Sequence, residues 1–426
     1  MNQQEFIEKY RSNMLKDLGD LIAIPSTMDM SSAGDMAPFG TSAALALDVL
    51  LNKAAAMGME VKNYEGYAGE ITVGAGSRMV GILTHIDVVP AGDGWSTPPF
   101  QLTVQDGKMY GRGVSDDKGP IISALYAMKY LMDEQLLPAD TCVRLIVGAD
   151  EEEELRCITY YTKHAPRLPD CTFVADGNFP LVNCEKGLVD FNLTMDVEAV
   201  EDSQAKVLEL RGGSARNIVA DAASCRLMLR AEEKTDLLSK LRAVQDLTVV
   251  DTDGICTVTT TGIATHSMQP EKGRSAINAL IHGLAVSGIS LDIQKFVDAY
   301  DALIGLTYNG EKMGADWCDE LSGPLTFNVG TVEYANGKVK MEANTRYPVS
   351  KTYLDIDSTM FQKLRDAGFT VDPVLPMDPL YIPKDSPLIQ KLMQAYRAVS
   401  QDFDHDPLAI GGATYARFLP NSVSFG

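Results

Sequence analysis

Apolar residues in the first half of the chain gather in short runs, and three of these runs end in residues that can bind a metal. The runs are Met79 to Thr84 before His85, Cys142 to Ala149 before the acidic run Asp150 to Glu154, and Thr172 to Ala175 before Asp176. Short apolar runs bounded by turn residues predict buried strands. Because ligands collect outside the carboxyl ends of strands in open α/β sheets, the three endings should open onto a cleft.

Helical spacing of apolar residues alternates with these runs and predicts helices over residues 1–19, 41–57, 121–132 and 388–399. From about residue 185 the pattern changes to strand-like stretches with fewer helices, which predicts a separate α+β domain. We therefore expect a doubly wound α/β catalytic domain made of residues 1–184 and 377–426. An α+β domain over residues 185–376 should be inserted into it.

Composition narrows the partners and the compartment. The chain has 426 residues, 45% hydrophobic content, a formal net charge of -21 and seven cysteines. The acidic balance argues against nucleic acid and anionic membrane surfaces, because both attract a basic face. No apolar run in the sequence approaches the length of a membrane span. The scattered cysteines form no C-x-x-C pair, which predicts reduced thiols in the cytoplasm and no disulfide framework.

The His85-x-Asp87 pair is the first candidate for chemistry. Side chains alternate along a strand, so positions 85 and 87 share a face. The carboxylate of Asp87 can then accept the second ring N–H of His85 or lie just behind it, as in many metal-bound histidines. A structural pair is the alternative for an isolated His-x-Asp. Asp116 and Asp117 precede a predicted helix, where helix capping is the alternative to metal binding.

The acidic run after residue 149 has two parts. Glu153 and Glu154 are expected to begin a solvated helix, since acids suit the helix dipole there. Glu151 and Glu152 instead stand at the carboxyl end of a predicted strand, as His85 does. Three strand ends carrying ligands, together with an Asp pair at a helix start, favour a two-metal site of carboxylates and histidine.

Taken in order, these motifs resemble a known family. The motifs are His85-x-Asp87-Val-Val-Pro, Gly111-Arg-Gly-x-x-Asp116-Asp117-Lys118-Gly119-Pro120, Asp150-Glu151-Glu152, Asp176 and Gly411-Gly412-x-Thr414. The family comprises the dinuclear zinc peptidases related to aminoacylase, glutamate carboxypeptidase and succinyl-diaminopimelate desuccinylase. Within it, the chain is most similar to the branch of peptidase V and the carnosine-hydrolysing dipeptidases, and the resemblance spans nearly the whole chain.

The resemblance implies roles for six residues around two divalent metal ions, with zinc expected and manganese or cobalt as alternatives. The implied roles are one metal on His85 and Asp176, a bridge at Asp116, the second metal on Glu152, orientation of His85 by Asp87, and general-base catalysis by Glu151. It also implies a cis peptide bond between Asp116 and Asp117. Such a site activates a water for attack on a peptide bond.

The inserted domain resembles the family's lid, an extended ferredoxin-like domain. The resemblance implies that Asn217 and His266 stabilise an oxyanion and that Arg346 binds the carboxylate of the substrate, for which a guanidinium is well suited. It also places Gly411, Gly412 and Thr414 in the substrate site.

One position departs from the family pattern. The resemblance implies a histidine for the second metal beyond the Gly-Gly-x-Thr segment, and no histidine follows His405. His405 precedes Gly411 and is expected on the surface. Either the sequence is incomplete at its C-terminal end or the second site is weakened; one tightly bound metal per chain is the expectation for the chain as given.

These features predict a metal-dependent dipeptidase, with Xaa-His dipeptides among the candidate substrates. Two alternatives remain open at this point: a deacylase of N-acyl amino acids, and a binding homologue without turnover. The insert is long enough for two lobes of the family's short lid, so we expect a monomer whose His266 acts on its own metals.

Overall fold

The computed structural model describes all 426 residues, except for the side chain of Leu375. The chain divides into two compact units. The first comprises Met1–Asn183, Ile382–Leu408 and Thr414–Gly426, and the second comprises Cys184–Tyr381 and Ala409–Ala413. The sequence predicted domain boundaries at 184/185 and 376/377, and the chain passes from one unit to the other at 183/184 and 381/382. A five-residue segment, 409–413, also belongs to the second unit.

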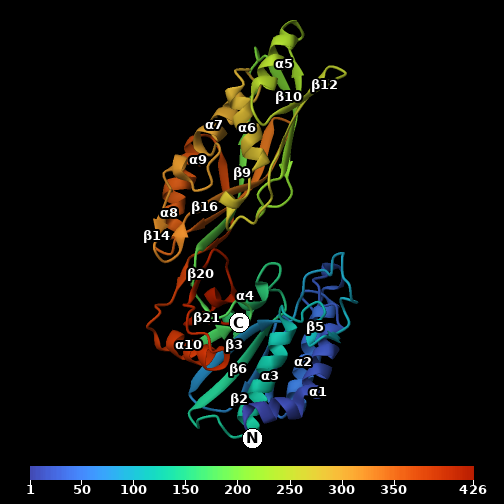
Figure 1. Ribbon diagram of the computed structural model, residues 1–426, viewed down its shortest axis with the longest axis vertical. Coiled ribbons are helices and arrows are strands. Elements are labelled where there is room, and N and C mark those ends of the chain that lie inside the picture. The colour runs from blue at the N-terminus through green and yellow to red at the C-terminus, as the bar shows by residue number, and fades with distance from the viewer. The chain divides into compact units, whose positions relative to one another are not determined.

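The first unit carries a mixed sheet with helices packed on it. Its strands are β1 (Glu60–Tyr64), β2 (Ala68–Val73), β3 (Arg78–His85), β6 (Thr141–Gly148), β7 (Cys171–Val174), β8 (Val182–Glu185) and β21 (Ser422–Ser424), with a separate hairpin of β4 (Thr103–Gln105) and β5 (Lys108–Tyr110). Its helices are α1 (Gln3–Ile22), α2 (Thr41–Ala56), α3 (Lys118–Asp133), α4 (Arg156–His164) and α10 (Pro387–Ser400), with short helical turns η1 (Met30–Ser32) and η6 (Tyr415–Phe418). Helices α1 and α3 pack together (Figure 1).

The parallel strands of this sheet run in the order β6-β3-β7-β21, and antiparallel strands flank them. Both faces of β3 and β6 are buried along most of their length, which is why these strands read as continuous apolar runs. The fold class is confirmed as α/β, and so are the helices expected over 1–19, 41–57, 121–132 and 388–399, which are α1, α2, α3 and α10.

The second unit is built on one antiparallel sheet of eight strands, in the order β12-β13-β11-β10-β16-β17-β9-β18. Their bounds are β9 (Gly187–Asp196), β10 (Ala205–Gly213), β11 (Ala222–Leu229), β12 (Thr248–Thr252), β13 (Ile255–Thr261), β16 (Thr326–Ala335), β17 (Lys338–Tyr347) and β18 (Thr370–Met377). Of the remaining short strands, β14 (Cys318–Asp319) and β15 (Gly323–Pro324) pair with each other, and β19 (Leu380–Tyr381) and β20 (Leu408–Ile410) pair with β8 in the first sheet.

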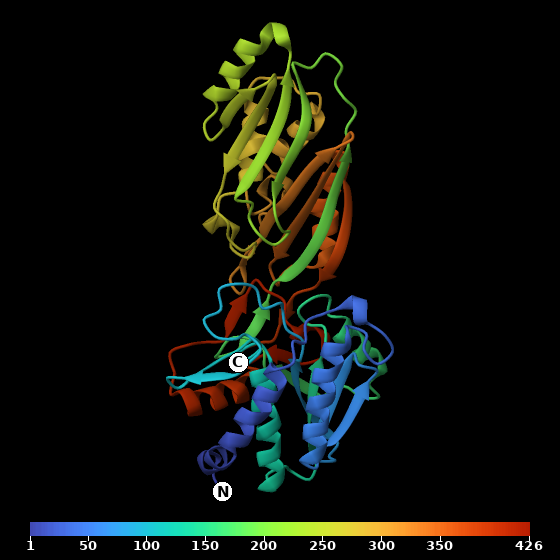
Figure 2. The ribbon, with the colours of Figure 1, turned by 90° about the vertical axis from the view of Figure 1, so that its right-hand side faces the viewer.

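The helices of this unit cover one face of the sheet, and Figure 2 shows the strands in front of them. They are α5 (Lys234–Ala243), α6 (Ala276–Val286), α7 (Gln294–Leu303), α8 (Tyr353–Ile356) and α9 (Gln362–Asp366), with short turns η2 (Ala231–Glu233), η3 (Pro270–Lys272), η4 (Glu311–Met313) and η5 (Asp357–Phe361). Burial alternates along β9, since every second side chain faces the helices. Among the described residues, no helix combines the length and apolarity needed to cross a membrane.

Candidate metal centre

Strand β3 delivers His85 to the carboxyl end of the parallel strands, where its side chain is fully buried. Its Nε2 lies 2.8 Å from Oδ1 of Asp116 and 3.7 Å from Oδ2 of Asp176. Its Nδ1 lies 3.0 Å from the main-chain oxygen of Asp87 and 3.4 Å from Oδ1 of that residue. Asp87 thus holds one ring nitrogen, which leaves Nε2 as the nitrogen that faces the other carboxylates.

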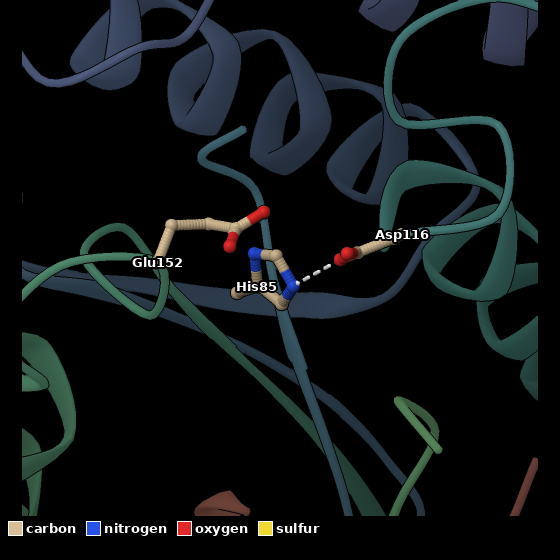
Figure 3. A group of neighbouring side chains, drawn as sticks. All are labelled: His85, Asp116 and Glu152. Carbon is tan, nitrogen blue, oxygen red and sulfur yellow. Dashed lines mark hydrogen bonds and ion pairs between the residues drawn. The ribbon is translucent and has the colours of Figure 1, made fainter. Parts of the chain in front are cut away.

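Two groups of three side chains share His85. In each group the ligand atoms all lie within 4.8 Å of one another, and the groups are His85, Asp116 and Glu152, and His85, Glu151 and Asp176. Figure 3 shows the carboxylates of Asp116 and Glu152 on opposite sides of the imidazole of His85. All six residues expected around two metals therefore lie in one cluster of the first unit.

The turn that carries Glu151 and Glu152 is held at both ends by Asp150. The carbonyl oxygen of Asp150 accepts from the N–H of Leu155, and its Oδ2 accepts from the N–H of Arg156 at 3.0 Å. The N–H of Glu152 donates to Oδ2 of Asp87, also at 3.0 Å.

The prediction that a helix begins at Glu153 and Glu154 is wrong. Both residues are exposed in the turn, and α4 begins at Arg156. The carboxylate of Asp150 accepts from the main-chain N–H of Arg156. This bond closes the turn at Arg156, so the helix begins only there.

The peptide bond between Asp116 and Asp117 is cis, as the resemblance implies. Asp117 occupies the N-cap position of α3, but its side chain makes no capping hydrogen bond. Its Oδ2 accepts instead from the main-chain N–H of His85 at 2.9 Å. Helix capping is therefore the wrong explanation for the side chain of Asp117, which supports the strand end beneath the cluster.

Burial and crowding shift the acid–base behaviour of the cluster. Burial, reinforced by the charges of Asp176, Asp87 and Glu152, raises the pKa of Glu151 to about 8, although the charge of His85 opposes the shift. Burial and the neighbouring carboxylates likewise raise the pKa of Glu152 to about 6. Carboxyl groups this close to one another are costly to ionise together.

The residues present fit a divalent cation. Among the described residues, Oδ1 of Asp117 is a buried acceptor atom without a hydrogen-bond partner. One imidazole with several carboxylates is a donor set that zinc and manganese accept. A bound cation would also stabilise the ionised forms of Glu151 and Glu152, whose pKa values are raised by burial and, to a smaller extent, by the neighbouring carboxylates.

Five of the residues predicted for the substrate site belong to the second unit. They are Asn217, His266, Arg346, Gly411 and Gly412. The main chain joins the first two, because the N–H of Ser267 donates to the carbonyl oxygen of Asn217 at 2.9 Å. Nδ1 of His266 accepts from the N–H of Met268, which leaves the proton of a neutral ring on Nε2. Burial and the charge of Arg346 lower the pKa of His266 and favour this neutral form.

Arg346 is buried in the second unit and held from two sides. Its Nε donates to Oδ1 of Asn344 at 3.2 Å, and its Nη1 donates to the carbonyl oxygen of Gly411. Met268 lies close to Gly411 and Gly412, since a Cβ added to Gly411 would lie 3.4 Å from Cγ of Met268. The sequence did not predict a role for Asn344 or Met268 at this site, because an Asn in a strand and a Met in a loop are common and indicate no particular function.

Thr414 belongs to the first unit, whereas the other five predicted substrate residues belong to the second. Its hydroxyl accepts from the N–H of Ala416 and caps the helical turn η6. The next residue, Tyr415, is fully buried and its ring lies edge-on to the ring of His85, with centroids 6.4 Å apart. Sequence reasoning missed Tyr415; its position directly after the Gly-Gly-x-Thr motif was the only signal.

Comparison with known proteins identifies one peptidase family and relatives that are named as dipeptidases. The model of peptidase family M20/M25/M40 matches residues 81–426. Putative dipeptidase YtjP of Bacillus subtilis (strain 168) is 32% identical over 435 residues, covering 100% of this chain and 92% of that protein. A protein named Putative dipeptidase from Staphylococcus epidermidis is 32% identical over 432 residues, covering 99% of this chain and 91% of its own length.

Solved structures agree with this at the level of the fold. Human carnosine dipeptidase 1 matches with a TM-score of 0.54 and 16% identity, covering 99% of this chain and 91% of that one. The aminoacylhistidine dipeptidase of Vibrio alginolyticus matches with a TM-score of 0.56 and 14% identity, covering 97% of this chain and 90% of that one.

Proposed function

The chain belongs to peptidase family M20/M25/M40 and is a metallopeptidase, and we propose that it hydrolyses the peptide bond of free dipeptides with two divalent metal ions. The observation that carries this proposal is the cluster of carboxylates around Nε2 of His85, in which overlapping groups of three side chains could hold a metal ion. Similarity over the full chain to relatives named as dipeptidases supports a small peptide substrate. Xaa-His dipeptides are among the proposed substrates, because a protein of the same fold is an aminoacylhistidine dipeptidase.

In this proposal His85 and Asp176 would hold one metal, Glu152 would hold the second, and Asp116 would contribute its carboxylate to both. The distances of Asp116 and Asp176 from the same ring nitrogen support a first metal beside His85, and the place of Glu152 at the second metal is what the resemblance implies. Bound zinc, or manganese or cobalt in its place, would polarise the scissile carbonyl and lower the pKa of the attacking water. Asp87 keeps the ring of His85 oriented through Nδ1.

Glu151 is the proposed general base. A general base works best with a pKa near the operating pH, and burial moves the pKa of this carboxyl toward that range. Its position beside the ligands would let it take a proton from the water and pass it to the leaving amine. The hydrogen bonds of Asp150 hold the turn that carries it.

The second unit would bind the substrate. Arg346 is oriented by Asn344 and Gly411, and its guanidinium suits the C-terminal carboxylate of a dipeptide. His266 in its neutral form has its proton on Nε2, which suits donation to a developing oxyanion, with Asn217 beside it.

The proposed location is the cytoplasm. The seven free cysteines fit its reducing conditions.

The test compares hydrolysis of alanyl-alanine with that of its N-acetylated form, with added zinc or manganese. The free dipeptide should be cleaved faster, and Glu151→Gln should lose about 100-fold or more in kcat, as removal of a general base does. Glu153→Gln is the matched control, since Glu153 is exposed in the same turn. Preference for the acetylated form would make the chain a deacylase, and tight binding without turnover would make it a binding homologue.

A further inference from the structure

A buried pair lies behind the metal cluster. The hydroxyl of Tyr415 lies 2.7 Å from Sγ of Cys157, and both side chains are fully buried. The two residues are 258 positions apart in the sequence. Nothing in the proposed reaction uses either of them.

Gly148 makes room for this pair. It is the last residue of β6 and lies opposite His85 in the register of β3 and β6. A Cβ at this position would lie 2.5 Å from Oη of Tyr415 and 2.9 Å from Sγ of Cys157. The pair therefore fills space beside the strand pairing that carries His85, and only glycine leaves that space open.

Each partner of the pair touches a different part of the centre. The ring of Tyr415 meets the ring of His85 edge-on, at an interplanar angle of 89°. Cys157 lies in the first turn of α4, directly after the turn that carries Glu151 and Glu152. That turn is closed by bonds from Leu155 and Arg156 to Asp150, so a shift at the start of α4 would move the two glutamates.

We propose that Tyr415 is a positioning residue of the metal centre, whose hydrogen bond with Cys157 keeps the imidazole of His85 and the turn of Glu151 and Glu152 in one fixed arrangement. The ring limits the rotation of His85, and the hydroxyl ties the start of α4 to that ring. Ligands held in this way lose less freedom when a cation binds. This inference rests on the proposed metal centre and is independent of the substrate.

The test is a titration of the metal-free protein with zinc against a competing chelator. Tyr415→Phe removes only the hydroxyl and should weaken zinc binding about 5- to 10-fold, less than the 10- to 100-fold loss typical of a partner bonded directly to a ligand. Tyr300→Phe is the matched control, because Tyr300 is equally buried and its hydroxyl donates to Asn278 at 2.7 Å in the second unit. The control should lose stability but keep its zinc affinity within twofold.

Variants at Cys157 separate a positioning role from a loss of stability. Cys157→Ser keeps a hydrogen-bonding group and should retain zinc affinity within about twofold, whereas Cys157→Ala should resemble Tyr415→Phe. The double variant Tyr415→Phe/Cys157→Ala should be no weaker than either single variant, since both remove one interaction. If Tyr415→Phe does not fold, the comparison of Cys157→Ser with Cys157→Ala gives the same answer.

The role of Tyr415 and the existence of the metal centre would be refuted by different results. Unchanged zinc affinity in folded Tyr415→Phe, or equal affinity in Cys157→Ser and Cys157→Ala, would refute the role of Tyr415. A parent protein that binds no zinc or manganese would refute the metal centre itself, and with it the proposed function.

Discussion

At the scale of single residues, the cluster around His85 is a set of carboxyl groups that resist ionising together. One imidazole and six carboxyl groups, those of Asp87, Asp116, Asp117, Glu151, Glu152 and Asp176, meet at the ends of three strands and one helix. Burial raises the pKa of Asp117, Glu151, Glu152 and Asp176, and neighbouring carboxylates raise these values further, whereas the hydrogen bond with His85 lowers the pKa of Asp116. The geometry thus favours either protons or cations in this place.

Asp116→Ala should lower the bound metal at both proposed positions, because Asp116 is the proposed bridge. Metal analysis by plasma emission after gel filtration measures the stoichiometry directly. Asp93→Ala, at an exposed aspartate, is the control and should bind as the parent does. If Asp116→Ala kept the parent's metal content, two metals sharing this carboxylate would be ruled out.

The contribution of Glu151 to the stability of the metal-free protein should fall as the pH rises. The folded protein holds the proton of Glu151 with a pKa of about 8, against an ordinary value of 4.5. The contribution of this carboxyl to stability is therefore complete below pH 4.5 and is lost progressively as the pH rises to about 8.

Glu151→Gln mimics the protonated form and should remove the part of the pH dependence that comes from Glu151, while the raised pKa of Glu152 keeps its own part. At pH 8 it should raise the free energy of unfolding of the metal-free protein by roughly 1 to 3 kcal/mol, with little change at pH 4.5. Urea unfolding in the presence of a chelator measures the difference, with Glu153→Gln as the control. An effect of equal size at both pH values would show that the titration of Glu151 is not its cause.

Arg346→Lys should cost the enzyme about 10- to 100-fold in kcat/KM for dipeptides, because a lysine cannot reproduce the two-pronged geometry of a guanidinium. Dipeptide amides should already be poor substrates of the parent. Arg274→Lys, at a half-exposed arginine paired with Asp246, serves as the control. Equal cleavage of the amide and the acid by the parent would remove Arg346 from the proposed role.

At the scale of elements, the strands position the site because their ends coincide. His85 pairs with Gly148 at the last rung of the β3 and β6 ladder, and β7 ends two residues before Asp176. Apolar periodicity predicted β3, β6, β7 and the long helices correctly. It did not predict β10, β11, α5 or α7, although burial alternates along β11 and along most of β10, as on a sheet with one covered face.

The start of β9 depends on a glycine for a steric reason. Gly187 pairs with Tyr347 of β17, and a Cβ at position 187 would lie 2.1 Å from the ring of Tyr347. Gly187→Ala should therefore displace the tyrosine and destabilise the second unit by roughly 1 to 3 kcal/mol, as overpacking does.

Urea unfolding measures this loss. Gly34→Ala is the control, because a Cβ at Gly34 meets nothing within 4 Å. A Gly187→Ala protein as stable as the parent would mean that Tyr347 can move away without cost.

At the scale of the whole molecule, the chain crosses between two units four times, and the last two crossings enclose only the segment Ala409–Ala413. This segment is bound to the second unit, where the N–H of Lys186 donates to the carbonyl oxygen of Ile410 and Arg346 donates to Gly411. The residues that follow it, Thr414 and Tyr415, belong to the first unit. The chain therefore joins the proposed carboxylate site to the proposed metal centre through a few covalent links.

We expect the protein to be a monomer, because the insert over residues 185–376 is long enough for two lobes of the family's short lid. Sedimentation at micromolar concentration measures the mass directly. Mixing His266→Ala chains with Glu151→Gln chains is a second check and should restore no activity. A dimer whose mixed chains regain activity would show that His266 works across an interface.

The sequence by itself determined the chemistry available at each strand end. His85, Asp116, Glu151, Glu152 and Asp176 could be singled out because local periodicity marks strands and helices, and because three predicted strand ends and one helix start carry ligand residues together. The cis peptide bond between Asp116 and Asp117 was also expected, through the resemblance, and is present.

Only the tertiary structure decided what surrounds that chemistry. Tyr415 reaches Cys157 because β21 pairs with β7 and returns the end of the chain to the sheet. The side chain of Asp117 leaves the helix it precedes for the main chain of His85. Such contacts join residues tens or hundreds of positions apart, and local pattern carries no information about them, because they depend on how strands pair and which space a glycine leaves open.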